Sequence, residues 1–453
     1  MRIHLIATGG SVMHNLAIAL HKKGYSVTGS DDEIFEPAKS HLDKYGLLPK
    51  KWGWFPENIT KDIDVVILGM HARGYNPELL QAQKLNLKIY SFPEYIYEQS
   101  KEKMRVVIGG SHGKTTITSM IMHVLNYHKV DFDYMVGSQL EGFDTMVKLT
   151  EKAPFIILEG DEYLSSAIDR RPKFHLYKPQ LALLSGIAWD HINVFPTFEN
   201  YIEQFRIFIE QIDDGRTLVY CKTDENVVKL VDEIEKPINK FSYGIPEYVI
   251  KNGITYIIRK RKEIPLKIFG KHNLQNLNGA RVICNQLGID DMSFYEAMQL
   301  FKGAAKRLEL VCSNDKTIVY KDFAHSPSKL KATIDAVKEQ FPDKIIVACM
   351  ELHTFSSLSS NFLSGYDGSM NKADEAIVYF NPHTIEHKKL PALTSDDIKK
   401  SFNKNNLLVF NDSVKLGETL VNSDKENKIF LLMSSGNFDG IDFEELGKKL
   451  TSQ

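Results

Sequence analysis

The sequence is poor in cysteine and has no pair of closely spaced cysteines. Its four cysteines lie far apart along 453 residues, at positions 221, 284, 312 and 349. A disulfide framework or a zinc site needs paired cysteines, so we interpret these four as reduced core residues. The N-terminus, MRIHLIATGG, lacks signal-peptide anatomy, and no apolar run reaches membrane-spanning length. We therefore expect a cytoplasmic protein without membrane insertion.

An excess of charge of either sign is also missing. The chain has 56 Lys and Arg against 58 Asp and Glu, a formal net charge of -2. The sequence as a whole therefore indicates no affinity for nucleic acid or for an anionic membrane. Internal repeats and low-complexity tracts are absent, and 43% hydrophobic and 25% charged residues are ordinary for a globular protein. A chain of this length predicts about three domains.

What is present is a stretch at residues 105–118 that reads RVVIGGSHGKTTIT. Its apolar start predicts a buried strand, its glycines a tight turn, and residues 118–127 a helix. In such a cradle, N–H groups and the helix dipole hold phosphate oxygens, Lys114 neutralises charge and the Thr115 hydroxyl ligates Mg²⁺. Ile108 replaces a glycine of the full GxxxxGK[ST] pattern, but the strand–turn–helix context still predicts a nucleoside triphosphate site. The predicted contacts are Gly110, Ser111, His112, Gly113, Lys114, Thr115 and Thr116.

The first hundred residues predict a separate nucleotide-binding unit. A strand, a glycine turn, a helix at 13–23 and a second strand form a Rossmann-like βαβ pattern, with an acidic residue placed to meet a ribose hydroxyl. Ala7 occupies the first glycine position of GxGxxG, so a NAD-dependent oxidoreductase is a disfavoured alternative. Arg73, which follows a third strand, either pairs with a diphosphate or is a solvated surface residue. The candidate contacts are Gly9, Gly10, Ser11, Ser30, Asp31, His71, Ala72 and Arg73.

Acidic residues and a histidine follow two further apolar runs in the central stretch. The first run leads to Glu159, and the second leads to Asp190 and His191. Mg²⁺ prefers oxygen ligands, and an isolated histidine is more often structural. The neighbouring Asp190 and the phosphate loop shift that balance towards a ligand. The pattern therefore predicts that Glu159 and His191 hold a magnesium ion near the phosphate loop, in addition to the one that Thr115 ligates.

Residues 247–268 predict a small antiparallel insert. The alternating pattern at 248–258 is interrupted by Asn252 and Gly253, a strong signal for a β-hairpin. A helix then opens after the sequence GKHN. Asn273, the last residue of that sequence, either caps the helix or reads an adenine edge.

Six ordered motifs make the chain similar to the Mur ligases, the ATP-dependent amide ligases of bacterial cell-wall synthesis. The resemblance covers nearly all of the chain, and the shortened phosphate loop of this family accounts for Ile108. The motifs are GSHGKTT at 110–116, Glu159 with Asp161-Glu162, Asp190-His191, GKHNLQN at 270–276, FKGAAKRLEL at 301–310 and DFAHSP at 322–327.

The resemblance implies an α/β fold of three domains. Residues 1–102 would form a Rossmann-like domain that binds the UDP-sugar. Residues 103–304 would form a central P-loop ATPase-type α/β domain that carries the antiparallel insert. Residues 305–453 would form a C-terminal Rossmann-like domain that holds the amino substrate and closes over ATP.

The resemblance also implies a reaction in two steps. The lactyl carboxylate of UDP-N-acetylmuramate attacks the γ-phosphorus of ATP, and an amine then displaces phosphate from the acyl phosphate. Lys114, Glu159 and His191 would act at the phosphates together with Mg²⁺. The implied contacts outside this group are Asn273 for adenine, Asp322 for ribose, Arg307 for the γ-phosphate, and His325 for substrate or for stabilising its own loop.

The amine is the open question. Residues 158–174, 189–195 and 433–441 are similar to members that attach the tripeptide L-alanyl-γ-D-glutamyl-meso-diaminopimelate, which we favour. Residues 351–359 are similar to the loop that faces the amino substrate in members that attach L-alanine, the alternative. Phe323 stands where those L-alanine-attaching members usually have tyrosine.

Two rival functions fit the sequence less well. A folate-type polyglutamate ligase shares the phosphate loop but lacks a separate N-terminal Rossmann unit. A nucleotide-binding regulator without ligase activity has no chemical need for Lys114, Glu159, His191 and Arg307 together. The sequence makes no prediction of oligomeric state.

Overall fold

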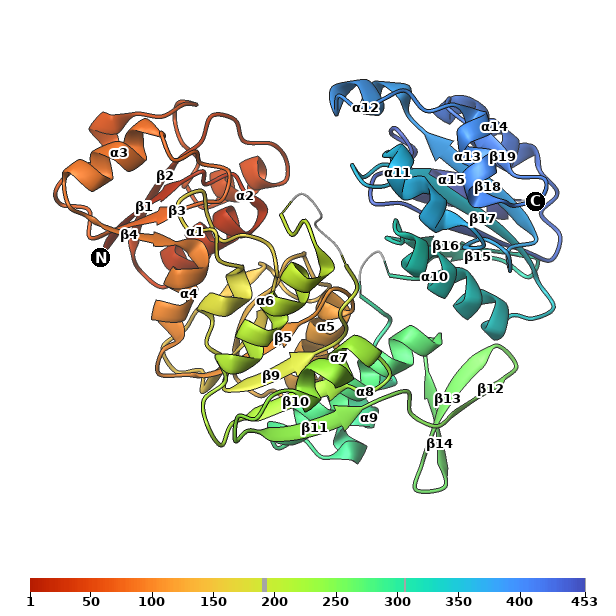
Figure 1. Ribbon diagram of the computed structural model, residues 1–453, viewed down its shortest axis with the longest axis horizontal. Coiled ribbons are helices and arrows are strands. Elements are labelled where there is room, and N and C mark those ends of the chain that lie inside the picture. The colour runs from red at the N-terminus through yellow and green to blue at the C-terminus, as the bar shows by residue number, and fades with distance from the viewer. Residues whose placement is uncertain (190–193, 305–306, 453) are drawn as a thin grey trace. The chain divides into compact units, whose positions relative to one another are not determined.

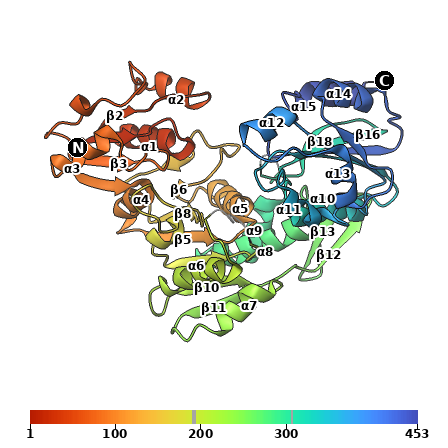
Figure 2. The same ribbon diagram turned by 45° about the horizontal axis from the view of Figure 1, so that its top comes forward.

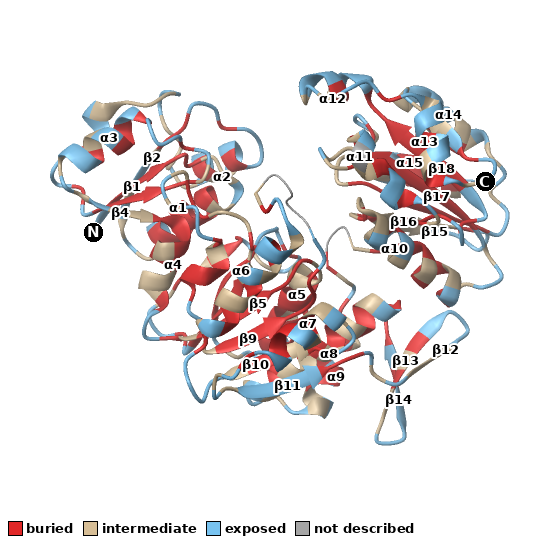
Figure 3. Ribbon diagram, viewed as in Figure 1, coloured by how far each residue is buried: buried red, intermediate tan, exposed pale blue. Residues whose placement is uncertain are grey.

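The computed structural model describes residues 1–189, 194–304 and 307–452 (Figure 1). Internal contacts divide the chain into two compact units. The first contains Met1–Ile245 and Gln275–Met298, and the second contains Pro246–Leu274 and Gln299–Gln453. Buried residues concentrate in the strands of both units (Figure 3).

The N-terminal part of the first unit alternates strands and helices, as the Rossmann-like pattern predicts. Its elements are β1 (Arg2–Ile6), α1 (Ser11–Lys22), β2 (Ser26–Ser30), α2 (Ala38–Lys44), the 3-10 turn η1 (Pro56–Asn58), β3 (Val65–Leu68), α3 (Pro77–Lys84), β4 (Lys88–Ser91) and α4 (Phe92–Ser100). The strand order is β2-β1-β3-β4, and every pairing is parallel. Helix α4 begins at a capping box, in which Ser91 accepts from the backbone of Glu94 and Glu94 accepts from that of Ser91.

The central part of the first unit forms a second, larger sheet. Its elements are β5 (Met104–Gly109), α5 (Lys114–Tyr127), β6 (Asp133–Met135), β7 (Val147–Lys148), β8 (Phe155–Glu159), the 3-10 turn η2 (Lys173–Leu176), β9 (Leu181–Leu184), α6 (Phe198–Glu210), β10 (Thr217–Cys221), α7 (Glu225–Asp232), β11 (Asn239–Tyr243), α8 (Lys271–Gln286) and α9 (Asp291–Met298). Within the described residues this sheet has seven strands in the order β11-β10-β9-β5-β8-β6-β7. All pairings are parallel except that of β6 with β7. Helix α5 packs against β5 and β8 (Figure 2).

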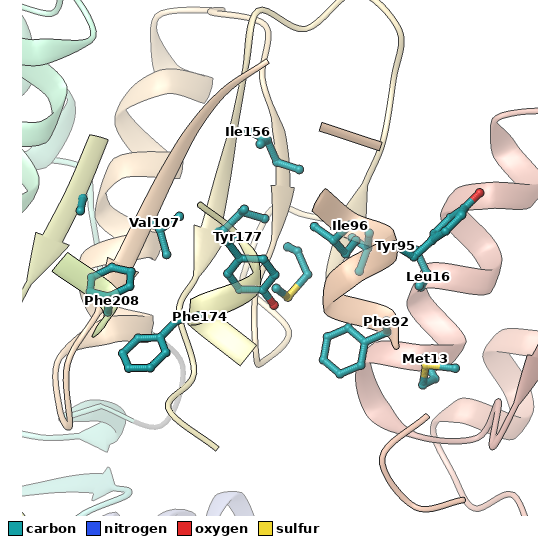
Figure 4. Packing of buried hydrophobic residues seen from close by; sticks show 14 of the residues in the cluster. Met13, Leu16, Phe92, Tyr95, Ile96, Val107, Ile156, Phe174, Tyr177 and Phe208 are labelled. Atoms are coloured by element: carbon teal, nitrogen blue, oxygen red, sulfur yellow. The ribbon is translucent and has the colours of Figure 1, made fainter. Parts of the chain in front are cut away.

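One buried cluster joins residues of both sheets in the first unit. Figure 4 shows Met13 of α1 and Phe92 of α4 in the same cluster as Tyr177 and Phe174 of the central part. The Phe174 ring stacks on Phe208 of α6 with 4.7 Å between ring centroids. Each such side chain contributes about 1.5–3 kcal/mol when buried, so the sheets of this unit are held together by apolar packing.

Tyr177 places a polar atom inside this cluster. Its side chain is fully buried, and its hydroxyl oxygen has no hydrogen-bond partner among the residues that the structure describes. Burial, with smaller effects of Asp161 and Glu159, raises the pKa of Tyr177 well above its usual value. Because a buried unpaired hydroxyl costs about 1–3 kcal/mol, Tyr177→Phe is expected to raise the free energy of unfolding by about 1 kcal/mol or more. Urea denaturation measures this change, and a loss of stability would contradict it.

The second unit contains a six-stranded sheet among its described residues. Its order is β15-β16-β20-β17-β18-β19, built from β15 (Glu309–Ser313), β16 (Thr317–Asp322), β17 (Ile345–Leu352), β18 (Glu375–Phe380), β19 (Leu408–Phe410) and β20 (Lys428–Met433). Only β15 runs antiparallel, on the edge beside β16. The helices and turn of this part are α10 (Pro327–Gln340), α11 (Ser360–Leu363), η3 (Ser364–Tyr366), α12 (Pro382–His387), α13 (Ser395–Phe402), α14 (Ser413–Asn422) and α15 (Phe443–Thr451).

The predicted insert is confirmed as a three-stranded antiparallel sheet. It consists of β12 (Tyr248–Lys251), β13 (Ile254–Arg259) and β14 (Lys262–Leu266). Asn252 and Gly253 lie at the β12–β13 turn with φ of 52° and 72°, as an Asn-Gly hairpin requires. The Thr255 hydroxyl lies 2.8 Å from Gln340 of α10. Contacts of this kind group the insert with the second unit, whereas the sequence-based boundary at 304 assigns it to the central domain.

No helix among the described residues is long and apolar enough to cross a membrane.

Candidate nucleotide sites

The predicted phosphate cradle lies between β5 and α5 in the first unit. Gly110 and Gly113 have φ of 130° and 79°, values that L side chains rarely adopt. A Cβ on Gly110 would lie 2.1 Å from Ser185 Oγ, and one on Gly113 would lie 2.6 Å from Asn276 Oδ1. Both positions therefore require glycine for conformation and for space.

Lys114 lies over its own loop. Its Nζ donates to the carbonyl oxygen of Gly110 at 2.5 Å and to Glu162 Oε2 at 2.6 Å. Burial alone lowers the pKa of Lys114, but the negative charges of Glu162, Asp161 and Glu159 outweigh it, so the pKa is raised. The ammonium group is therefore charged and poised at the loop.

Thr115 and Glu159 form a pair of oxygen donors beside this lysine. Thr115 Oγ1 donates to Glu159 Oε1 at 2.6 Å, and the N–H of Gly137 donates to Glu159 Oε2 at 2.8 Å. Such donors fit Mg²⁺, which prefers oxygen ligands. Asp190 and His191 lie outside the described residues. In the described part of the chain, no group of three or more His, Cys, Asp and Glu side chains is arranged to hold a metal ion.

A second ion pair borders the phosphate cradle. The sequence did not predict this pair as part of the site. Asp161 Oδ2 accepts from Lys173 Nζ at 2.5 Å. Burial raises the pKa of Asp161, but Lys173 and Lys114 outweigh it and lower the pKa to about 2. The acidic run after β8 was the available signal, yet only tertiary contacts show which lysine each carboxylate meets.

The other loop residues tie the cradle to the segment after β9. The Ser111 hydroxyl lies 2.9 Å from His112 Nδ1 and accepts the N–H of Ala188 at 2.8 Å. The backbone N–H of Ser111 also donates to Gly186 at 2.9 Å. Thr116 is buried at the start of α5. These contacts fix the loop conformation, while direct nucleotide contacts of these residues remain predictions.

The glycine turn of the N-terminal sheet is closed by an acid. The N–H of Gly9 donates to Asp31 Oδ2 at 2.7 Å, and a Cβ on Gly9 would lie 2.9 Å from that oxygen. Ala7, which stands at the fingerprint's first glycine, has a φ of 66°. Left-handed backbone costs a non-glycine residue about 1–2 kcal/mol, so the turn keeps glycine-like geometry without the glycine.

The other residues that we predict to contact UDP differ in how far they are exposed. The Ser30 hydroxyl is buried and lies 3.2 Å from His4 Nε2, so it faces the interior. Ser11 starts α1 directly after Gly10, and Ala72 is buried after β3. His71 and Arg73 are exposed beside it. Since β1 and β3 are neighbours, the ends of these strands lie at one edge of the sheet.

Asp31 predicts a stability change with pH. Burial raises the pKa of Asp31 from 3.8 to about 6, although the Gly9 N–H opposes this. The folded state thus holds a proton that the unfolded state releases, so stability is lost as pH rises from about 4 to about 6. We expect Asp31→Asn to remove this loss, which is worth at most about 3 kcal/mol. Thermal unfolding of both proteins at pH 4 and pH 7 tests this, and parallel pH profiles would contradict it.

Asn273, near the start of α8, does not cap its helix. It is the third residue of α8, and its Nδ2 donates to the carbonyl oxygen of Phe269 at 3.0 Å. The capping prediction is therefore wrong, because the helix begins two residues earlier at Lys271. An adenine contact stays a prediction.

Asp322 organises the loop after β16. Its carboxylate accepts the N–H groups of Leu308 and Ala324, each at 2.7 Å. Burial raises the pKa of Asp322, opposed by these N–H donors and by the charges of Arg307 and His272. Both carboxylate oxygens of Asp322 thus accept hydrogen bonds within the protein. A ribose contact stays a prediction.

Arg307 and His325 both contact Phe323. The Arg307 guanidinium lies 4.7 Å from the centroid of Phe323, a cation–π distance. His325 Nδ1 lies 2.8 Å from the carbonyl oxygen of Phe323, which is the loop contact that the sequence left open. Phe323 thus contacts both residues, although Arg307 precedes β15 and His325 follows β16.

The fold and the cradle define a nucleoside-triphosphate-binding α/β protein. Three family models match the chain: the catalytic domain of the Mur ligase family at residues 2–103, the Mur ligase middle domain at 108–284, and the Mur ligase, glutamate ligase domain at 306–436. The chain belongs to the Mur ligase family, whose members are ATP-dependent amide ligases. The predicted α/β fold of three domains is thereby confirmed.

The names of individual relatives differ in the amine substrate that they give. A UDP-N-acetylmuramate–L-alanine ligase from Sulfurihydrogenibium is 32% identical over 368 residues, which cover 80% of this chain and 78% of that protein. The structure of UDP-N-acetylmuramate–alanine ligase from Thermotoga maritima has a TM-score of 0.70 at 22% identity, covering 99% of this chain and 98% of that chain. The murein peptide ligase from Psychrobacter arcticus has a TM-score of 0.66 at 21% identity, covering 100% and 99%. At these identities the two structures establish the fold alone.

Proposed function

We propose that this protein joins the tripeptide L-alanyl-γ-D-glutamyl-meso-diaminopimelate to UDP-N-acetylmuramate at the expense of ATP, a step of peptidoglycan recycling. The meeting of Lys114, Thr115 and Glu159 at one glycine loop supports the ATP-dependent step, and the similarity of residues 158–174, 189–195 and 433–441 to tripeptide-attaching members supports the amine. This group can hold a triphosphate and a magnesium ion, which is what activation of a carboxylate as an acyl phosphate needs.

The first step brings two anions together, so charge neutralisation and positioning supply most of the catalysis. Lys114 and the loop N–H groups would hold the terminal phosphates, and Arg307 would neutralise the γ-phosphate. Magnesium, when bound by Thr115, Glu159 and His191, would withdraw charge from the phosphate oxygens. The muramoyl carboxylate then displaces ADP from the γ-phosphorus.

The second step forms the amide. The amine attacks the acyl carbon, and inorganic phosphate leaves from the tetrahedral intermediate. In this scheme Asn273 and Asp322 would hold adenine and ribose, and His325 would orient substrate from the loop that it shares with Phe323. The N-terminal turn at Gly9 and Gly10, with Asp31, His71 and Arg73 at the same sheet edge, would hold the UDP group.

The charge of one loop supports a peptide over a free amino acid. Residues 351–359, which the family resemblance sets against the amino substrate, contain no Lys or Arg. A free amino acid carries a carboxylate beside its amine, and a desolvated carboxylate needs a cationic partner. His353 is the only basic side chain of this segment, and its Nδ1 lies 3.4 Å from the buried carboxylate of Glu351. A peptide has a neutral amide at the same place and carries its carboxylates further along the chain, whereas the sequence of this loop is similar to that of members that attach L-alanine.

L-alanine remains the second candidate, because the curated relative with 32% identity carries that activity in its name. The test measures ADP release with UDP-N-acetylmuramate and either the tripeptide or L-alanine, together with the mass of the product. We expect at least a tenfold higher kcat/KM with the tripeptide. The N-acetylated tripeptide is the control and should give no product. Strong activity with L-alanine and none with the tripeptide would reverse the ranking.

A further inference from the structure

A buried carboxylate faces the lysine of the phosphate loop. Glu162 is 1% exposed, and its Oε2 lies 2.6 Å from Lys114 Nζ. The two residues are 48 positions apart in the sequence. Since a buried charge is costly unless it is paired and hydrogen-bonded, each of the two charges depends on the other in the nucleotide-free protein.

Glu162 is also anchored from a different element. The hydroxyl of Tyr201, on α6, donates to Glu162 Oε1 at 3.1 Å. Tyr201 is fully buried and packs edge-on against Phe205 with 5.1 Å between ring centroids. The carboxylate is thus held by a rigid aromatic support and can in turn fix the position of the lysine.

The contact between Glu162 and Lys114 has opposite effects on the binding of a triphosphate and on the positioning of the lysine. An incoming triphosphate competes with Glu162 and the Gly110 carbonyl for the ammonium group of Lys114. The negative charge of Glu162 also repels the phosphates at short range. At the same time, a lysine held at one point loses less conformational freedom when it meets a phosphate.

On the basis of the function proposed above, we propose that Glu162 is a positioning residue for Lys114 that weakens nucleotide binding while it aims the lysine for phosphoryl transfer. Tyr201 supports it through the hydrogen bond to Oε1.

The test compares Glu162→Gln with the wild-type protein. Gln keeps the shape of the side chain and its acceptor for Tyr201, but removes the carboxylate that is hydrogen-bonded to Lys114, while the charges of Asp161 and Glu159 remain. We expect the Kd for ADP with magnesium, measured by calorimetry, to fall about three- to tenfold. The kcat for ligation is expected to fall at least tenfold. An unchanged or higher Kd, or an unchanged kcat, would overturn the proposal.

Two further variants separate positioning from general structural damage. Tyr201→Phe keeps the charge of Glu162 and removes its support, so kcat should fall several-fold without tighter binding of ADP. Asp169→Asn removes a carboxylate of the same segment that pairs with Arg171 at 2.6 Å instead, and should change neither quantity. If Asp169→Asn shifts the Kd as Glu162→Gln does, the proposal is wrong.

Two outcomes need readouts of their own: a Glu162→Gln variant that does not fold, and a failure of the proposed function. Thermal unfolding first checks that Glu162→Gln is folded, and if it is not, an unchanged kcat in Tyr201→Phe overturns the proposal. The ADP measurement needs neither UDP-N-acetylmuramate nor an amine. A wild-type protein that binds ADP but ligates neither amine would refute the proposed function, while the Kd comparison would still decide the role of Glu162.

Discussion

Lys114→Met is expected to lower kcat for ligation by about 10²–10³-fold, because a charge preorganised at the phosphates typically contributes that factor. In the structure the Lys114 side chain is 14% exposed, and its ammonium group is hydrogen-bonded to Gly110 and Glu162. Methionine keeps most of the length and apolar volume of the side chain but has no charge and no donor. Steady-state ADP release at saturating substrates measures the effect.

The same substitution removes the lysine partner of the buried Glu162 carboxylate, and breaking a buried ion pair costs about 3–5 kcal/mol. The double variant Lys114→Met with Glu162→Gln removes that penalty. We expect it to recover most of the stability but none of the activity. Recovery of activity in the double variant would show that the lysine acts only through folding.

Gly110→Ala is expected to have the second-largest effect, abolishing nucleotide binding and lowering the free energy of unfolding by about 2–6 kcal/mol, since backbone strain and overpacking each cost about 1–3 kcal/mol. The φ of 130° at Gly110 is unfavourable for alanine. The added Cβ would also lie 2.1 Å from Ser185 Oγ and 3.0 Å from the Ser185 nitrogen. Chemical denaturation and ADP calorimetry report the two losses separately.

Gly215→Ala is the matched control for this substitution. Gly215 also has a positive φ, of 75°, but a Cβ there would meet nothing within 4 Å. We expect a loss of about 1 kcal/mol from backbone conformation alone, with unchanged nucleotide binding. Equal losses at Gly110 and Gly215 would mean that the contact with Ser185 does not matter.

Local signals in the sequence predicted most elements and the loop that matters most. Apolar runs predicted β5, β8 and β9 because buried parallel strands read as continuous hydrophobic sequence. The Asn252-Gly253 pair predicted the turn of the insert because few other residues accept its backbone angles. In contrast, the sequence predicts no strand at β15, which begins within the motif at 301–310, because an exposed edge strand has no apolar pattern of its own.

The residues of the candidate site were predictable from the sequence, but the contacts between them were not. Lys114, Thr115 and Glu159 follow from motif and strand-end position, and the structure brings all three together. Ser30 is a predicted UDP contact whose hydroxyl lies against His4, because only the packed interior decides on which side a hydroxyl finds its partner.

The sequence by itself determined the phosphate loop, the alternation of strands and helices and the family, because glycine turns and apolar periodicity act over a few residues. Only the tertiary structure decided that Glu162 rather than Asp161 pairs with Lys114, while Asp161 takes Lys173. It also decided that Asp31 closes the first glycine turn and that Tyr201 supports Glu162. These contacts join residues 12 to 48 positions apart. They depend on the order of strands in the sheet, which no local pattern specifies.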